Sequence, residues 1–180
     1  AERWVTSMDA KSAGNVLLLV GTTATDLGGA HVTELAGGIL PGGTGEIPLL
    51  DLQAGPANAK AVARAIRTGG VCSAHDLSEG GLLVAAAEMG FAGRLGIELD
   101  LDAVPGDSAN PMVTAFAETP SRYLLEVASE HVDAVVAALG DAHHAVVGRV
   151  HEDSVLRASA LGLEESLDAL RQRWLAPLDW

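Results

Sequence analysis

The residues best suited to chemistry stand together in the run His75-Asp76-Leu77-Ser78-Glu79-Gly80-Gly81. A short apolar run at 70–73 precedes them and an apolar segment at 82–89 follows. This pattern predicts a strand, a turn and a helix. Backbone N–H groups in the first turn of a helix have no partner within the helix, so such a turn can bind an anion. The candidate ligand-binding residues here are therefore His75, Asp76, Ser78, Glu79, Gly80 and Gly81.

Each of these residue types has an expected local role. Ser78 is a predicted N-cap, with its hydroxyl accepting a hydrogen bond from an N–H two or three residues later. Asp76 and Glu79 are expected where the helix dipole favours negative charge, and the glycines permit close approach of a ligand or of backbone. The same pattern also describes a well-capped helix that binds nothing, with His75 forming a hydrogen bond in the turn. Both interpretations remain open from spacing alone.

Three segments resemble one family in the correct order. The run 75–81, followed by Leu82 and by Ala87-Glu88-Met89, resembles the His-Asp-x-Ser-acid-Gly-Gly-Leu…Ala-Glu-Met pattern of phosphoribosylformylglycinamidine synthase, synthetase subunit. Residues 7–15 with 17–21 resemble the start of that family's last domain, and 26–30 resemble its acid-Leu-Gly-Gly-Ser turn. The chain departs from the family at Ala10, which is usually Leu, and at Ala30, which is usually Ser. The missing hydroxyl at Ala30 weakens the case for a ligand at Gly28 and Gly29, which stay among the candidates.

This resemblance implies a role as part of a larger enzyme. It implies that residues 1–180 form a single domain, the second C-terminal domain of an internally duplicated synthetase, with 1–15 as a leading segment. The parent enzyme would use ATP and Mg²⁺ to convert formylglycinamide ribonucleotide to its amidine in purine biosynthesis. Its partners would be the preceding domains, a glutaminase subunit that supplies ammonia and a small accessory subunit. The family's catalytic and magnesium-binding residues lie in the preceding domains, so we expect no catalytic residue, no metal site and no activity in this chain alone.

Two alternatives remain beside this interpretation. One is the equivalent domain of a hydrogenase maturation factor or a related ATP-dependent enzyme of the same superfamily, which has its own Asp-x-Thr-x-Gly-Gly-Leu turn. The segment Met8-Asp9-Ala10-Lys11 and the pair His75-Asp76 speak against it. The other is a non-catalytic ligand-binding or interaction module that works alone.

Composition and charge limit the classes of partner. The chain has 180 residues, of which 48% are hydrophobic and 3% aromatic, so we expect one globular domain with a core of Ala, Val and Leu. The net charge of −13 argues against nucleic acid and anionic membrane as partners, because both require clustered Lys and Arg. There is no apolar run of the roughly 20 residues needed to span a bilayer, and no signal peptide is recognisable. The single cysteine, Cys72, is expected to be a buried, inert thiol in a cytoplasmic protein.

Hydrophobic periodicity predicts an α+β sandwich on a mixed sheet, and the family resemblance implies that this sandwich has three α/β/α layers. The family resemblance implies the same architecture, that of the C-terminal domain of aminoimidazole ribonucleotide synthetase. The segment 37–48 holds five glycines and two prolines and is expected to be a flexible surface loop. The three-residue connection at 151–153 predicts an antiparallel hairpin between two of the strands. The expected strands are 16–20, 70–73, 95–101, 122–127, 145–150 and 154–158, and the expected helices are 30–35, 56–68, 82–89, 109–119, 132–139 and 163–175.

Overall fold

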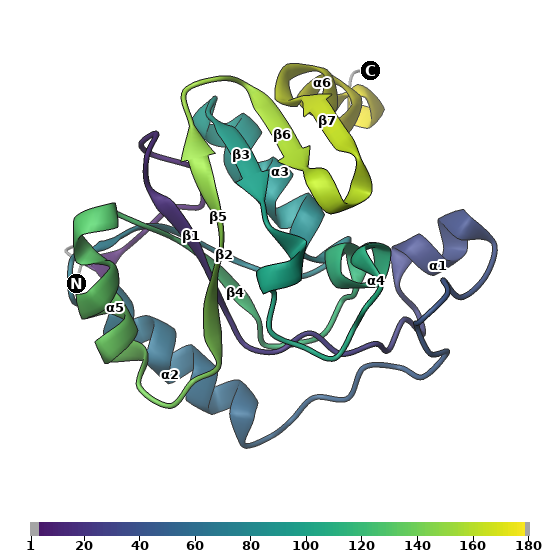
Figure 1. The fold of residues 1–180 in the computed structure, drawn as a ribbon, viewed down its shortest axis with the longest axis horizontal. Coiled ribbons are helices and arrows are strands. Elements are labelled where there is room, and N and C mark those ends of the chain that lie inside the picture. The colour runs from purple at the N-terminus through teal and green to yellow at the C-terminus, as the bar shows by residue number, and fades with distance from the viewer. Residues whose placement is uncertain (1–3, 179–180) are drawn as a thin grey trace.

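A seven-stranded mixed sheet forms the centre of the protein in the computed structural model, which describes residues 4–178 (Figure 1). The strand order is β2-β4-β1-β5-β3-β6-β7, and neighbouring strands are antiparallel except for the parallel pair β3 and β6. The first three residues of the expected leading segment lie outside the described residues. The strands are β1 Val16–Val20, β2 Val71–Asp76, β3 Gly96–Leu99, β4 Tyr123–Val127, β5 His144–His151, β6 Val155–Ala158 and β7 Leu163–Ser166.

Helices cover both faces of this sheet, so the three-layer α/β/α architecture predicted from the sequence is confirmed. Figure 1 shows α2 and α5 together on one face and α3 on the other, with α4 and α6 beside α3. The α-helices are α1 His31–Ala36, α2 Ala54–Ile66, α3 Gly81–Gly93, α4 Pro111–Phe116, α5 Val132–Leu139 and α6 Leu167–Leu175. Short 3-10 turns occur at Leu101–Ala103, Ser129–His131, Ser159–Leu161 and Ala176–Leu178.

Strand β1 separates two hydrophobic cores. All five of its residues are buried, and successive side chains of a strand point to opposite faces. Leu17 and Leu19 accordingly pack in the cluster that contains α3, whereas Leu18 packs in the cluster that contains α2 and α5. Full burial of a leucine side chain contributes about 1.5–3 kcal/mol, so this alternation fixes the register of β1 strongly.

The prediction of a hairpin between residues 145–150 and 154–158 is wrong. Both strands exist, but β3 lies between them, antiparallel to β5 and parallel to β6. The chain after β5 crosses the start of β3, where a Cβ on Gly96 would lie 2.5 Å from the carbonyl oxygen of Asp153. A glycine at this position therefore allows β3 to fit inside the turn, which a short connection alone does not reveal.

The closing helix is also shorter than the sequence predicts. Residues 163–166 form β7, where Glu164 pairs with Arg157 of β6. The hydroxyl of Ser166 then accepts a hydrogen bond from the N–H of Ala169 at 3.3 Å and begins α6. The N-cap serine, and not the hydrophobic period, sets the start of the helix.

The segment 37–48 contains no α-helix or strand, as predicted, and it is joined to the domain by hydrogen bonds. The N–H of Leu27 donates to Thr44 at 2.9 Å, and the N–H of Gly28 donates to Glu46 at 2.8 Å. The flexibility of this loop stays a prediction. Within residues 4–178, no helix has the length and apolar character needed to cross a membrane.

Candidate functional site

The candidate pair His75 and Asp76 ends β2 and does not lie in the turn where the sequence placed it. The imidazole Nε2 of His75 lies 2.8 Å from a carboxylate oxygen of Glu88, in the middle of α3. These side chains are 16% and 23% exposed. The pairing of β2 with β4 extends to Asp76, so the backbone of His75 is fixed in β2. Its side chain therefore joins β2 to α3 through Glu88.

Ser78 is not the N-cap of α3, contrary to the prediction. Its hydroxyl donates to Oδ2 of Asp76 at 2.8 Å, and α3 has no side-chain cap at its N-cap residue, Gly80. Short polar side chains readily bond to a neighbouring residue in this way instead of capping. The bond from Ser78 is the main reason that the pKa of Asp76 lies below its ordinary value, with a smaller contribution from His75.

The negative charge at the N-terminus of α3, expected from Asp76 and Glu79, is supplied by Glu118. Its Oε1 accepts hydrogen bonds from the N–H of Gly80 at 2.8 Å and from the N–H of His31 at 3.0 Å. The described first turn of α3 carries no acidic residue of its own. One carboxylate thus joins the turn before α1, which follows Gly28 and Gly29, to the turn before α3. No clear signal in the sequence predicts this role, because Glu118 lies beyond α4, where the pattern predicts only the end of that helix.

The glycines of the turn serve close backbone packing. Gly80 and Gly81 have φ values of +75° and +65°, which residues with a Cβ rarely adopt. A Cβ on Gly81 would lie 2.5 Å from the carbonyl oxygen of Ala117. Gly28 is confined likewise, because a Cβ there would lie 2.5 Å from the carbonyl oxygen of Gly45, whereas a Cβ on Gly29 would meet nothing within 4 Å.

A buried arginine supports the segment that carries Glu118. The Arg122 side chain is 1% exposed and donates to the carbonyl of Thr119 and the hydroxyl of Thr23, both at 3.0 Å, and to the carbonyl of Ala117. Burial lowers the pKa of Arg122 to about 10. Arg122 therefore stays charged at neutral pH and fixes residues 117–119 through their backbone. The sequence pattern predicts only a strand residue at this position.

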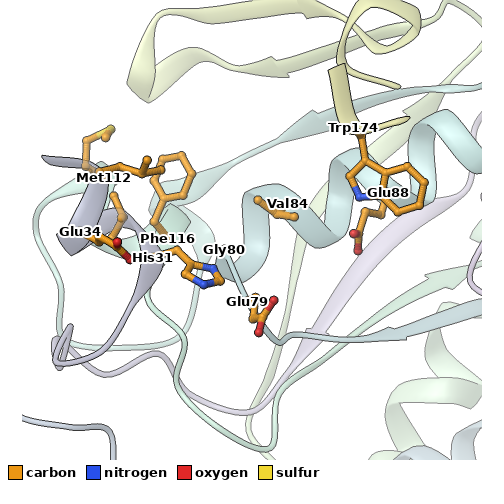
Figure 2. Close-up of a pocket in the computed structure, with 11 residues that line it drawn as sticks. His31, Glu34, Glu79, Gly80, Val84, Glu88, Met112, Phe116 and Trp174 are labelled. Atoms are coloured by element: carbon orange, nitrogen blue, oxygen red, sulfur yellow. The ribbon is translucent and has the colours of Figure 1, made fainter. Parts of the chain in front are cut away.

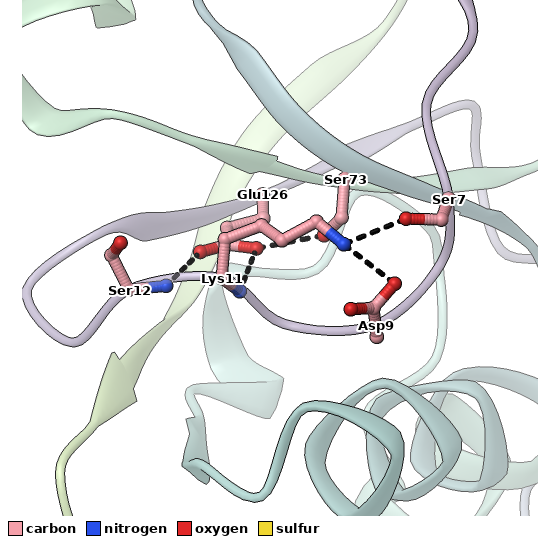
Figure 3. Close-up of polar contacts among 6 residues, drawn as sticks. All are labelled: Ser7, Asp9, Lys11, Ser12, Ser73 and Glu126. Carbon is pink, nitrogen blue, oxygen red and sulfur yellow. Dashed lines mark hydrogen bonds and ion pairs between the residues drawn. The ribbon is translucent and has the colours of Figure 1, made fainter.

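A second buried charge, Glu126, holds the leading segment against the sheet (Figure 3). Its carboxylate is fully buried and accepts from the backbone N–H groups of Lys11 at 2.8 Å and Ser12 at 3.0 Å. Asn15 and Ser73 donate to it as well, at 2.7 and 2.8 Å. Figure 3 shows the ammonium group of Lys11 turned away from this carboxylate. The prediction from the sequence did not include this role, although a glutamate between Leu125 and Val127 in an apolar strand is a visible signal.

A hollow of about 580 Å³ opens beside the N-terminus of α3 (Figure 2). Glu79 and Gly80 line it, whereas His75, Asp76 and Ser78 are absent from its wall. Figure 2 shows Glu88 and Trp174 at one end and the residues of α1 and α4 at the other. The candidate residues thus fall into two groups. His75, Asp76 and Ser78 belong to the junction between β2 and α3, whereas Glu79 and Gly80 line the hollow. The described residues contain no group of three or more side chains placed to hold a metal ion.

The thiol of Cys72 lies half-buried on β2, close to the Glu126 cluster. Burial raises its pKa, and the nearby charge of Glu126 raises it further. A thiol that resists ionisation is a poor nucleophile, which agrees with the expectation of an inert cysteine.

Comparison with known proteins gives a consistent result. A family model described as "AIR synthase related protein, C-terminal domain" matches residues 12–160. The phosphoribosylformylglycinamidine synthase subunit PurL of Thermococcus sibiricus is 31% identical over 153 residues, which is 84% of this chain and 21% of that protein. The chain thus spans about a fifth of the length of that relative.

Solved structures show the same fold. The structure of PurLQS from Thermotoga maritima superposes with a TM-score of 0.78 at 22% identity, over 93% of this chain and 27% of the other. Escherichia coli HypE superposes with a TM-score of 0.62 at 20% identity, over 89% of this chain and 51% of the other.

Proposed function

Because this chain belongs to the family of AIR synthase related C-terminal domains, we propose that it is the second C-terminal domain of a PurL-type phosphoribosylformylglycinamidine synthase in purine biosynthesis. The observation that carries this proposal is the 31% identity over 153 residues to a PurL subunit. The His75-Asp76 pair and the segment 8–11, on which the family resemblance was based, favour PurL over HypE, whose likeness is one of fold.

The proposed parent enzyme is an ATP-dependent carbon–nitrogen ligase. ATP and Mg²⁺ activate the formylglycinamide oxygen of the ribonucleotide, and ammonia replaces it to give the amidine. A glutaminase subunit supplies the ammonia, and a small accessory subunit completes the assembly. Thermotoga maritima PurL, which shares this fold, has been solved in complex with ATP, and this supports ATP as the parent's nucleotide.

The contribution of this chain is to support a site that other domains build. The N–H of Gly80, which could have bound a substrate anion, already donates to Glu118. The turn around it is fixed by Gly81 and by Arg122, and neither presents a reactive group outward. A rigid turn whose N–H group is already hydrogen-bonded within the domain can position neighbouring domains without taking part in the chemistry.

The test is an exchange of domains. The chain alone, given ATP, formylglycinamide ribonucleotide and ammonium, should form no amidine. The Thermococcus sibiricus subunit should lose its activity when its matching segment is deleted and regain activity when residues 12–180 replace that segment. A folded chimera that binds ATP but is no more active than the deletion variant would refute the proposal, as would turnover by this chain alone.

A further inference from the structure

A continuous groove runs along the outer side of α3. The hollow of about 580 Å³ described above and a neighbouring hollow of about 280 Å³ share four lining residues, Val84, Glu88, Phe116 and Trp174. Together they extend from the N-terminus of α3 at Gly80 to Phe91. Eleven helical residues rise by ~16 Å, so the groove is about three helical turns long.

The floor of this groove is apolar and partly open to solvent. Trp174 is 52% exposed and its ring contacts that of Phe91 in a tilted arrangement, with ring centroids 5.5 Å apart, and Met112 at the other end is 36% exposed. Large exposed aromatic and methionine side chains in a hollow are typical of surfaces that bind a partner.

The charged residues of the groove are all acidic apart from His31. Glu34, Glu79 and Glu165 are exposed at its rim, and Glu88 lines both hollows. Neither Lys nor Arg lines either hollow among the described residues. His75 fixes the Glu88 carboxylate at 2.8 Å, so that this charge is already oriented before a partner arrives.

We propose that this groove binds an amphipathic helix of a partner polypeptide, with apolar side chains on one face and Lys or Arg beside them. The apolar face would cover Val84, Phe116 and Trp174, and the cationic side chains would pair with the rim glutamates and with Glu88. Helices bind in apolar grooves of this length through side chains at positions i, i+4 and i+7. A second copy of this chain fits poorly, because two chains of net charge −13 repel each other. This inference rests on the groove and not on the function proposed above.

The probe is a fluorescein-labelled 15-residue helical peptide of Leu and Lys, with the leucines on one face. Its binding to the full chain is followed by fluorescence anisotropy in 150 mM salt. A peptide of the same composition, scrambled so that the leucines share no face, controls for charge alone. We expect the amphipathic peptide to bind about tenfold more tightly than the scrambled one, since only it can bury apolar area in the groove. Equal binding of the two peptides would overturn the proposal.

Two triple variants with the same net charge locate the contact. Replacing Glu34, Glu79 and Glu165 with glutamine removes three rim charges and should weaken binding about tenfold, because each exposed ion pair contributes modestly. Replacing the exposed acids Glu130, Asp133 and Asp141 with their amides removes three charges far from the groove and should change affinity less than about twofold. An equal loss in both variants would show nonspecific attraction and overturn the proposal.

Val84→Arg tests the floor of the groove directly. The substitution places a positive charge between the two hollows and should abolish binding, while Val146→Arg, at an exposed position on β5, should not. Unfolding midpoints of both variants establish that they are folded. Unchanged binding by folded Val84→Arg would contradict the proposal. So would self-association of the wild-type chain that this substitution abolishes, because a second copy would then be the occupant.

Discussion

Gly81 and His75 contribute differently to the junction between β2 and α3. Gly81 adopts φ +65° with its Cα facing the backbone of residues 115–117, where a side chain has no space. His75 forms one short contact with Glu88, and both side chains reach solvent in part. A side chain at position 81 would therefore overlap backbone that cannot easily move, whereas Glu88 can be hydrated when the histidine is removed.

Gly81→Val should accordingly destabilise the protein more than His75→Ala. Strain at a positive φ costs about 1–3 kcal/mol, and the steric overlap with Ala117 adds to it. Loss of one hydrogen bond at His75 should cost about 0.5–1.5 kcal/mol. Urea midpoints of the two variants decide the order, and a histidine variant less stable than the glycine variant would contradict this account.

The bond between Ser78 and Asp76 predicts a dependence on pH. A carboxylate whose folded pKa is depressed adds stability above its unfolded pKa, near 3.9, and loses it as pH falls through the folded value. Ser78→Ala should raise the pKa of Asp76 toward the ordinary value and reduce stability at neutral pH by less than about 1 kcal/mol, since this side chain is 67% exposed. Carboxylate ¹³C titration measures the pKa. Ser78→Thr, which keeps the hydroxyl, should leave it low, and an unchanged pKa in Ser78→Ala would refute the assignment.

At the scale of elements, Glu126 connects the leading segment to the centre of the sheet. The segment 11–15 has little apolar contact with the core, so hydrogen bonds place it: those to this carboxylate and the backbone bonds of Gly14 and Asn15 with Val150. Glu126→Ala would leave four donors without this acceptor, two of them on the buried residues Asn15 and Ser73. Each unsatisfied donor costs about 1–3 kcal/mol, but the segment can move into water and recover part of that loss.

We therefore expect Glu126→Ala to lower the free energy of unfolding by about 2–4 kcal/mol. Amide hydrogen exchange should accelerate selectively at Lys11 and Ser12, while the interior of α2 exchanges as before. Glu130→Ala, at an exposed site, is the matched control and should change neither quantity. A Glu126→Ala variant that exchanges uniformly faster would mean that the carboxylate stabilises the whole sheet and is not a specific anchor of the segment.

Most of the helices and strands predicted from periodicity are present in the structure, whereas the predicted pairing of two strands is wrong. Strand β1 and helix α5 follow from apolar repeats, and Asn110-Pro111 begins α4 as the sequence predicts, with the Asn110 side chain accepting from Met112. Local rules failed where a distant element intervened, as β3 does between β5 and β6. The candidate turn shows the same limit, because the group at the N-terminus of α3 comes from Glu118, 38 residues further along the chain. Sequence spacing describes neighbours along the chain and carries no information on such contacts.

At the scale of the whole molecule, the net negative charge and the occupied N–H group of the turn both oppose the binding of phosphate. The chain carries −13, Asp76 and Glu79 stand near the start of α3, and Glu118 already accepts from its first free N–H. A phosphate dianion would thus enter a negative field, where one like-charge pair at about 4 Å costs on the order of 1–4 kcal/mol. A few backbone hydrogen bonds of roughly 1 kcal/mol each do not outweigh that cost.

We propose that this turn supports a nucleotide site built elsewhere and binds no phosphate unaided. Calorimetric titration of the chain with ADP, first in EDTA and then in millimolar Mg²⁺, tests the claim most directly. We expect no detectable heat of binding in EDTA and at most weak binding with Mg²⁺, which can bridge a carboxylate and a phosphate. Glu118→Gln is the comparison variant, since removing that charge should permit more binding than in the wild type. Tight binding of ADP by the wild-type chain in EDTA would contradict the account.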